Sequence, residues 1–267
     1  MITISHLRFL MFSLMLFAIS NTIFSKDIES QLNENSFSEL EVGKKKVLIL
    51  SISGKISKIL LDKLEIINNH LATKNISYPT LLVLLDSSGG DADAAIKIGR
   101  IFRKHHAHIL ITKYCASACV FAYSGGSIRI SPPYSLGTHL PRVTLSDRYS
   151  RVIKELDTEQ NFRAKKLLED FNSNLINFLS EMNINNSFYS FMNEQSRKIR
   201  WLSEDEADRY NLNGWTIENK NLNFEDLNYL YIQLRRKVVT ECIQPSNGDR
   251  KLIQDCYISA LIEMNII

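Results

Sequence analysis

The hydrophobic residues of this chain form short continuous runs that alternate with segments of helical spacing. Val47–Ile52, Thr80–Leu85 and His108–Lys113 are almost uninterrupted apolar runs, the pattern of strands that are buried on both faces. Between these runs, Ile56–Leu71 and Ala92–Phe102 place apolar side chains three and four positions apart, as helices do. The alternation of buried strands with helices predicts an α/β fold.

The second half of the chain predicts shorter strands and then helices. Ser127–Pro141 predicts short strands with a proline turn, and an apolar stripe from Ser146 to Met182 predicts one long helix or two stacked helices. The sequence SEDE at Ser203–Glu206 has the pattern of a capping box that opens a short helix. From about Asn223 onward, the pattern predicts a helical hairpin.

The N-terminus has the three-part layout of a secretory signal over residues 1–25. MITISHLR carries one basic side chain, Arg8, the apolar run FLMFSLMLFAIS follows, and small residues such as Ser20 or Ser25 suit cleavage. The alternative is a retained N-terminal anchor, because Phe9–Phe24 is nearly long enough to span a bilayer when tilted. Either form predicts an exported chain, periplasmic or secreted.

The remainder divides into a polar linker at residues 26–46, a main domain at 47–220 and a helical hairpin appendage at 221–267. With 267 residues, 45% of them hydrophobic and 23% charged, the chain can bury a substantial core. The net charge of +3 is spread along the sequence, and no Lys/Arg tract is interleaved with aromatic residues. Nucleic acid is therefore not an expected partner.

Export changes the interpretation of the four cysteines, because disulfides persist in oxidising compartments. Cys242 and Cys256 flank the turn segment IQPSNGDRKLIQD, and we expect a bridge between them that stabilises the fold by about 3 kcal/mol. Cys115 and Cys119 are four positions apart. They could form a second bridge or remain two buried thiols, and the pattern leaves both open.

Two strand ends carry small residues suited to a reactive site. The segment LLVLLDSSGGDADAA ends a strand in the Gly89-Gly90 turn, and TKYCASACVFAYSGG places Ser117 between a strand and a helix. Backbone N–H groups at a helix start are unpaired and favour negative charge. Gly89, Gly90 and the N–H of Ala118 could therefore form an oxyanion hole. The segment with Gly89 and Gly90 does not fit the phosphate-loop or dinucleotide patterns.

A histidine completes this set of residues. SLGTHLP places His139 after a predicted short strand, and histidine is the usual base for a serine nucleophile. His105, His106 and His108 in KHHAH are weaker candidates. They lie in a loop that enters a strand, where we expect exposure to solvent.

The order of these features resembles the Clp-peptidase branch of the ClpP/crotonase superfamily, and more closely its periplasmic Clp-peptidase-like members, which carry a C-A-S-A-C segment. The resemblance covers Val47–His139, and RWLSEDEADRYNLNGW at Arg200–Trp215 is similar to the family's segment after its third catalytic residue. It implies a superhelix of ββα units, here with a helical C-terminal extension. It also implies a homo-oligomer.

The resemblance implies a serine peptidase in which Ser117 is the nucleophile and His139 is the general base. Gly90 and Ala118 would donate N–H groups to the oxyanion, and Gly89 would shape the turn. The implied function is an exported, ATP-independent serine hydrolase that acts on peptides or unfolded chains. ATP is not expected outside the cytoplasm, so neither a partner ATPase nor a cofactor is expected.

The third catalytic residue is left open. The family's aspartate position falls at Gln195, with Asn193 and Glu194 beside it. An amide or a displaced carboxylate could still hold the histidine, as Cys-His-Asn enzymes show. The chain could also have no third member.

Three alternatives remain. Zinc could bind Cys115, Cys119 and His139, although a fourth ligand is missing. An inactive ClpP-like fold could serve as a binding or scaffolding module. A Ser–Lys dyad would use one of three lysines on the predicted long helix as a desolvated base: Lys154, Lys165 or Lys166.

Overall fold

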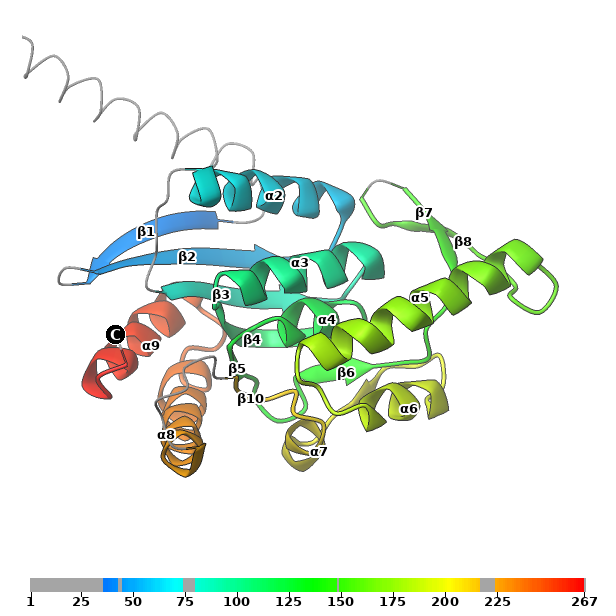
Figure 1. The fold of residues 1–267 in the computed structure, drawn as a ribbon. Helices are drawn as coiled ribbons and strands as arrows, with labels where there is room; N and C mark the ends of the chain where they lie inside the picture. The colour runs from blue at the N-terminus through cyan, green and yellow to red at the C-terminus, as the bar shows by residue number, and fades with distance from the viewer. Residues whose placement is uncertain (1–35, 43–44, 74–79, 148, 217–223, 267) are drawn as a thin grey trace, which may run out of the picture.

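The computed structural model describes residues 36–42, 45–73, 80–147, 149–216 and 224–266. The predicted signal or anchor segment, residues 1–25, lies outside these ranges. A mixed sheet runs through the protein with helices on both faces (Figure 1). Its four central strands are parallel neighbours: β2 (Lys45–Ser53), β3 (Thr80–Ser87), β4 (His108–Ala116) and β5 (Ile128–Ile130). The predicted α/β class is confirmed.

Four further strands extend this sheet. They are β1 (Ser36–Val42) antiparallel to β2, β10 (Gly214–Trp215) antiparallel to β5, β6 (Leu136–Thr138) parallel to the end of β4, and β9 (Arg200–Trp201) antiparallel to β6. Strand β1 lies inside the segment that we expected to be a linker, so that expectation was wrong from residue 36. An edge strand is half solvated and does not need an apolar run. The division at residues 220 and 221 stays a prediction.

Two helical layers explain why the central strands contain nearly continuous apolar runs. One face packs α2 (Lys58–Thr73), α3 (Ala92–Lys104), α4 (Cys119–Ser124) and α5 (Phe162–Glu181), and the other packs α8 (Phe224–Lys237), the π-helical turn η1 (Val238–Ile243) and α9 (Arg250–Glu263) (Figure 1). In β2, Leu48 and Leu50 belong to the first core, whereas Val47 and Ile49 belong to the second. Successive strand residues point to opposite faces, so both layers need apolar partners.

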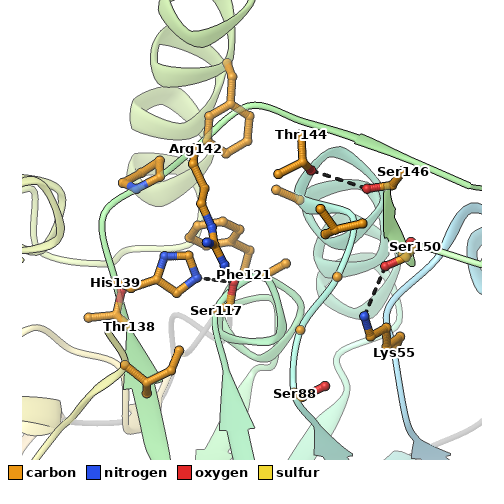
Figure 2. A pocket seen from close by; sticks show the side chains of 18 residues that line it. Lys55, Ser88, Ser117, Phe121, Thr138, His139, Arg142, Thr144, Ser146 and Ser150 are labelled. Atoms are coloured by element: carbon orange, nitrogen blue, oxygen red, sulfur yellow. Dashed lines mark hydrogen bonds between the residues drawn. The ribbon is translucent and has the colours of Figure 1, made fainter. Parts of the chain in front are cut away.

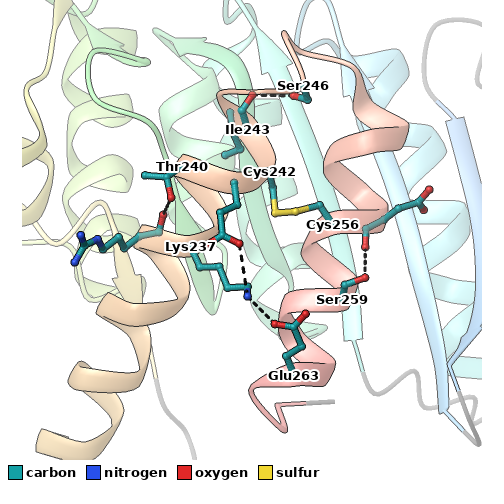
Figure 3. Close-up of a disulfide and its surroundings, with 11 residues drawn as sticks. Lys237, Thr240, Cys242, Ile243, Ser246, Cys256, Ser259 and Glu263 are labelled. Atoms are coloured by element: carbon teal, nitrogen blue, oxygen red, sulfur yellow. Dashed lines mark hydrogen bonds and ion pairs between the residues drawn. A yellow bond between two sulfur atoms is a disulfide. The ribbon is translucent and has the colours of Figure 1, made fainter.

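The C-terminal hairpin forms as predicted. Helix α8 continues into η1, and a turn leads into α9. The sulfurs of Cys242 and Cys256 are bonded, with their Cα atoms 5.5 Å apart (Figure 3). Lys237 of α8 also pairs with Glu263 of α9, at 2.6 Å. The expected bridge between these two cysteines is confirmed.

The prediction of a helix from Ser146 to Met182 was wrong for its first half. Strands β7 (Thr144–Ser146) and β8 (Val152–Glu155) form a hairpin, and α5 begins only at Phe162. The Asp147 carboxylate accepts hydrogen bonds from two backbone N–H groups inside the hairpin turn. The Asn161 side chain accepts a hydrogen bond from the backbone N–H of Ala164 at the start of α5. Side chains that bind nearby backbone in this way compete with a continuous helix.

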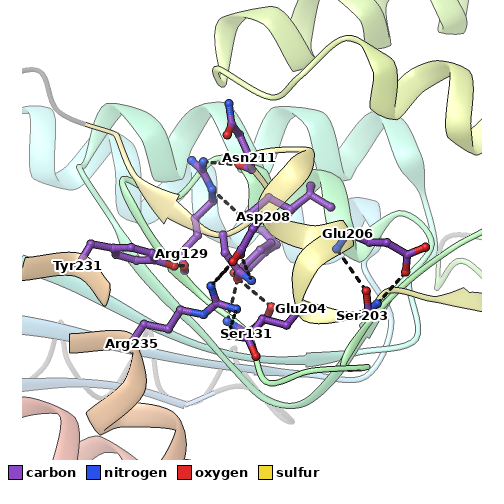
Figure 4. A network of polar contacts seen from close by, with 12 residues as sticks. Arg129, Ser131, Ser203, Glu204, Glu206, Asp208, Asn211, Tyr231 and Arg235 are labelled. Carbon is purple, nitrogen blue, oxygen red and sulfur yellow. Dashed lines mark hydrogen bonds and ion pairs between the residues drawn. The ribbon is translucent and has the colours of Figure 1, made fainter. Parts of the chain in front are cut away.

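Helices α6 (Ser187–Glu194) and α7 (Glu204–Arg209) follow α5, and a polar network around two buried arginines fixes α7 beside the sheet. The guanidinium of Arg129 in β5 is buried and donates to the Leu212 carbonyl at 2.8 Å, and burial lowers its pKa to about 10. Arg235 of α8 donates to both carboxylate oxygens of Asp208 in α7, at 2.7 and 2.9 Å (Figure 4). The predicted capping box at Ser203–Glu206 is confirmed. Within the described ranges, no helix is long and apolar enough to cross a membrane.

Candidate active site

Ser117 lies at the turn between the buried strand β4 and helix α4. Its φ is +57°, in the left-handed region that residues other than glycine rarely adopt. Its backbone N–H donates to the Gly137 carbonyl of β6 at 2.8 Å, and its carbonyl accepts the N–H of Val120 at 3.0 Å. The serine lines a cavity of about 230 Å³ at this end of the sheet. A strained strand-to-helix turn of this kind exposes a nucleophile.

His139 lies directly beside this serine. Its Nε2 atom is 2.7 Å from Ser117 Oγ (Figure 2). Its Nδ1 atom is 2.8 Å from the Leu140 carbonyl oxygen. A carbonyl oxygen can only accept, so Nδ1 carries the proton and Nε2 accepts from the serine hydroxyl. The parallel pairing of β4 with β6 brings the two residues together, although they are 22 positions apart in the chain. This arrangement leaves Nε2 ready to take the serine proton.

The three candidates for a third member do not contact the imidazole within the described residues. Asn193 and Glu194 are exposed at the end of α6, and the Gln195 amide donates to a carbonyl of its own helix at 2.8 Å. The hydrogen bond from His139 Nδ1 goes instead to the Leu140 carbonyl oxygen. Sequence reasoning missed this partner because a main-chain carbonyl has no residue signature.

The three residues expected at the oxyanion hole all line the cavity, but they differ in what they can do. Gly89 has a φ of +93°, and a Cβ there would lie 2.7 Å from the Cβ of Ser117, so only glycine allows this close approach. Its N–H donates to Ser87 Oγ at 3.1 Å. The N–H groups of Gly90 and Ala118 make no hydrogen bond within the described residues. These two remain available as donors, and Gly89 shapes the turn.

Cys115 and Cys119 are joined by a disulfide, with their Cα atoms 5.3 Å apart. The bridge therefore closes a short loop that contains Ser117, and both cysteine side chains are buried. Bonded sulfurs cannot act as thiolate ligands, so the zinc alternative loses two of its three ligands. In the described part of the chain, no three metal-binding side chains come together.

The lysines of the alternative dyad lie away from the cavity. Lys154 is exposed on β8, and Lys165 is exposed on α5. Lys166, also exposed on α5, pairs with Asp170 at 2.8 Å. None of the three lines the cavity that holds Ser117. The geometry favours histidine as the base.

The histidines of KHHAH also lie outside the cavity. His106 is exposed, whereas His105 and His108 are half-buried, so the expectation of exposure was wrong for these two. The Nδ1 atom of His108 lies 3.1 Å from the Tyr257 hydroxyl of α9. Burial lowers the pKa of His108 to about 4. This histidine contributes to the packing of α9 on the sheet.

Two cations at the cavity were missed by sequence reasoning. Lys55, in the turn between β2 and α2, donates from Nζ to the Ser150 carbonyl at 3.2 Å (Figure 2). Arg142 follows His139 by three positions and pairs with Glu155 of β8 at 3.3 Å. The arginine in SLGTHLPR was a usable signal, because it follows the candidate base closely. Nothing in the sequence near Lys55 pointed to the cavity.

No protein family model matches the chain, and no curated protein matches it. Among solved structures, the chain is similar to ClpP1 from Listeria monocytogenes, with 20% identity and a TM-score of 0.43, and to a mutant of that protein, with 20% identity and a TM-score of 0.47. Each comparison covers 65% of this chain and 92% of the ClpP1 chain. A mutant of the membrane-bound stomatin-specific protease 1510-N is 18% identical with a TM-score of 0.47, over 78% of this chain and 91% of that one. What the site can do therefore follows from its own geometry.

Proposed function

We propose that this protein is a serine hydrolase, most directly a peptidase, with Ser117 as nucleophile and His139 as general base. The observation that carries the proposal is the 2.7 Å contact between Ser117 Oγ and the Nε2 atom of an imidazole whose other nitrogen donates to a carbonyl. Gly90 and Ala118 line the same cavity, and their backbone N–H groups have no hydrogen-bond acceptor among the described residues. A nucleophile, its base and an oxyanion site are the parts that acyl transfer needs.

The geometry supports a two-step reaction. Ser117 Oγ attacks the carbonyl carbon of the scissile bond while its proton moves to His139 Nε2, and the N–H groups of Gly90 and Ala118 stabilise the oxyanion that forms. Collapse of the tetrahedral intermediate breaks the C–N bond, and the imidazolium gives its proton to the leaving amine. Water then attacks the acyl-enzyme with His139 again as base, and the acid product leaves.

The main-chain partner of His139 has a role in both steps. An imidazole that becomes positively charged needs an acceptor on Nδ1 to hold its orientation. The Leu140 carbonyl supplies this acceptor at 2.8 Å, but as a neutral group it stabilises the imidazolium less than a carboxylate does. We therefore expect a slower enzyme than one with a carboxylate in this position.

We also propose that the protein works outside the cytoplasm and without an ATP-driven partner, on peptides or unfolded chains. The two disulfides support an oxidising compartment. The cavity of about 230 Å³ suits a few side chains of an extended peptide better than a folded surface. A homo-oligomer stays a prediction, which light scattering of the purified protein would test.

A fluorophosphonate probe tests the proposed function. The wild-type protein should be labelled at one serine, Ser117→Ala should abolish labelling, and His139→Ala should slow it by about 100-fold or more. Circular dichroism of each variant would check that the fold persists. A folded wild-type protein that remains unlabelled would remove the hydrolase proposal and favour an inactive binding module.

A further inference from the structure

The cavity around Ser117 has a one-sided charge distribution. Among the described residues that line it, the charged side chains are Lys55 and Arg142, and none is an aspartate or glutamate. Much of the remaining polar lining consists of neutral hydroxyl groups, such as those of Ser88 and Thr138. A substrate group that enters this cavity therefore meets two positive charges and hydroxyl donors.

Lys55 is positioned to bind a ligand. Its ammonium donates one hydrogen bond within the described residues, to the Ser150 carbonyl at 3.2 Å. That acceptor is well fixed, because Ser150 is buried, has a φ of +59° and donates its own N–H to the Asp147 carbonyl. An ammonium group has three donors, so two remain for a substrate. No carboxylate pairs with Lys55 in the described part of the chain.

The carboxylate partner of Arg142 neutralises its positive charge only in part. Its guanidinium lies 3.3 Å from Glu155, and the same carboxylate pairs with Arg197 at 3.1 Å. One carboxylate therefore serves two guanidinium groups, and a net positive charge remains. A guanidinium has five N–H donors in a planar fork that fits a carboxylate well.

The adjoining cavity differs from the first because carboxylates as well as cations line it. It shares Arg142 with the first cavity, and Lys58, Asp91, Asp93 and Asp147 also line it. Of these carboxylates, Asp147 pairs with Arg151 at 2.6 Å. A substrate carboxylate would meet like charges as well as cations there, whereas beside Ser117 the charged side chains of the described lining are all cations. The charge pattern can therefore set the position of a substrate along the cleft.

We propose that Lys55 and Arg142 bind a carboxylate of the substrate next to Ser117, so that the site prefers acidic peptides. This inference rests on the proposed function and names its substrate class. The carboxylate can come from an Asp or Glu side chain or from a free C-terminus. These two sources share one chemistry and are separated by the two arms of the experiment.

The first arm uses peptidyl diphenyl phosphonates that differ only in a Glu, Gln or Lys side chain at the residue bearing the phosphorus. Ser117 Oγ forms a bond to phosphorus, phenoxide leaves, and the serine proton passes through His139 to give phenol. The second-order labelling rate should be about tenfold higher for Glu than for Gln. The advantage should shrink as salt is raised, because both cations are partly exposed.

Variants assign this preference to the two cations. Lys55→Gln and Arg142→Gln should each reduce the Glu-to-Gln ratio, and Lys55→Glu should shift the preference toward the Lys probe. Lys165→Gln and Arg163→Gln are matched controls, because both residues are exposed on α5 and neither lines the cavity. The controls should keep the wild-type ratio.

The second arm measures how well a peptide with a free C-terminal carboxylate, and the same peptide as its amide, protect Ser117 from the neutral Gln probe. Stronger protection by the acid supports recognition of a C-terminus. Equal rates in the first arm together with equal protection in the second would overturn the carboxylate site while leaving the labelled serine in place. A ratio that survives both Lys55→Gln and Arg142→Gln would also overturn it. Failure of every probe to label a folded protein would instead overturn the proposed function and this inference with it.

Discussion

The disulfide between Cys115 and Cys119 allows a direct test of how the chain holds its nucleophile. The two cysteines are four positions apart, and Ser117 lies midway between them with a φ of +57°. Replacing both with alanine removes the covalent tie and leaves β4 and α4 with apolar side chains at these positions. We expect a loss of reactivity at Ser117 that is larger than the loss of stability explains.

The magnitude follows from the length of the ring and the conformation of its central residue. In the chain-entropy model, a ring this short contributes about 2 kcal/mol to the free energy of unfolding. The left-handed conformation costs Ser117 about 1–2 kcal/mol. Without the disulfide, Ser117 can leave the left-handed conformation and recover this energy. A difference of 1.4 kcal/mol lowers the population of the reactive conformation by about tenfold. The rate of fluorophosphonate labelling should therefore fall by about tenfold.

The second disulfide provides a matched control. Cys242 and Cys256 are fourteen positions apart and tie the C-terminal hairpin, on the opposite face of the sheet from α4 (Figures 1 and 3). Replacing both with alanine should cost more stability, about 3 kcal/mol, and leave the labelling rate unchanged. Urea unfolding gives the stability, and the labelling time course gives the rate. A full labelling rate after loss of the Cys115–Cys119 bridge, or an equal loss in both double variants, would show that this bridge does not hold Ser117 in its reactive conformation.

Three further predictions follow from the site and its surroundings. Gly89→Ala should lower the fluorophosphonate labelling rate by about tenfold or more, because a Cβ there presses on the turn of the nucleophile. Asn193→Ala, Glu194→Gln and Gln195→Ala should each change that rate by less than about twofold, because the imidazole Nδ1 already has a main-chain acceptor. Burial lowers the pKa of His108 to about 4 in the folded protein. In the unfolded chain this histidine has an ordinary pKa of about 6.5. Below about pH 6.5 the unfolded chain therefore binds a proton that the folded protein does not bind, and unfolding becomes more favourable. The free energy of unfolding, measured by urea titration, should therefore fall by up to about 3 kcal/mol more in the wild type than in His108→Gln between pH 6.5 and pH 4.

Each of these predictions has a clear contrary result. Gly248→Ala is a control for Gly89→Ala, because Gly248 also has a positive φ but its added Cβ would meet the flexible side chain of Lys113, so an equal loss in both would argue against a specific contact with the nucleophile. A loss of 100-fold on Glu194→Gln would mean that a carboxylate does act on the imidazole. Parallel pH profiles for the wild type and His108→Gln would show that this histidine titrates alike in the folded and unfolded chain.

The sequence predicted those parts of the fold that depend on burial. Strands β2, β3 and β4 are apolar because each is covered on both faces, and this pattern is visible in one dimension. Strand β1 and the β7–β8 hairpin were missed because they lie at an edge or in solvent, where polar residues are tolerated. The signal for the hairpin was present in Asp147 and Asn161, whose side chains bind backbone where a helix was expected.

The site was predictable to the extent that it depends on residue type. Ser117 and His139 have side chains with a recognisable chemistry, and each follows a predicted strand. Their residue types and their order along the chain were therefore enough to predict them as a nucleophile and its base. The Leu140 carbonyl and Lys55 could not be found in this way. The first has no residue signature, and the second reaches the cavity only because the turn after β2 lies beside Ser150.

Trapping of the acyl-enzyme is the most direct test of Ser117 as a nucleophile. The wild-type protein is mixed with p-nitrophenyl acetate, quenched in acid within seconds and mapped by peptide mass spectrometry. The wild type should give a burst of nitrophenolate and an acetyl group on Ser117, both absent in Ser117→Ala and strongly reduced in His139→Ala. Acetylation of another residue, such as the nearby Ser88, or no acyl adduct on a folded protein, would contradict this role of Ser117.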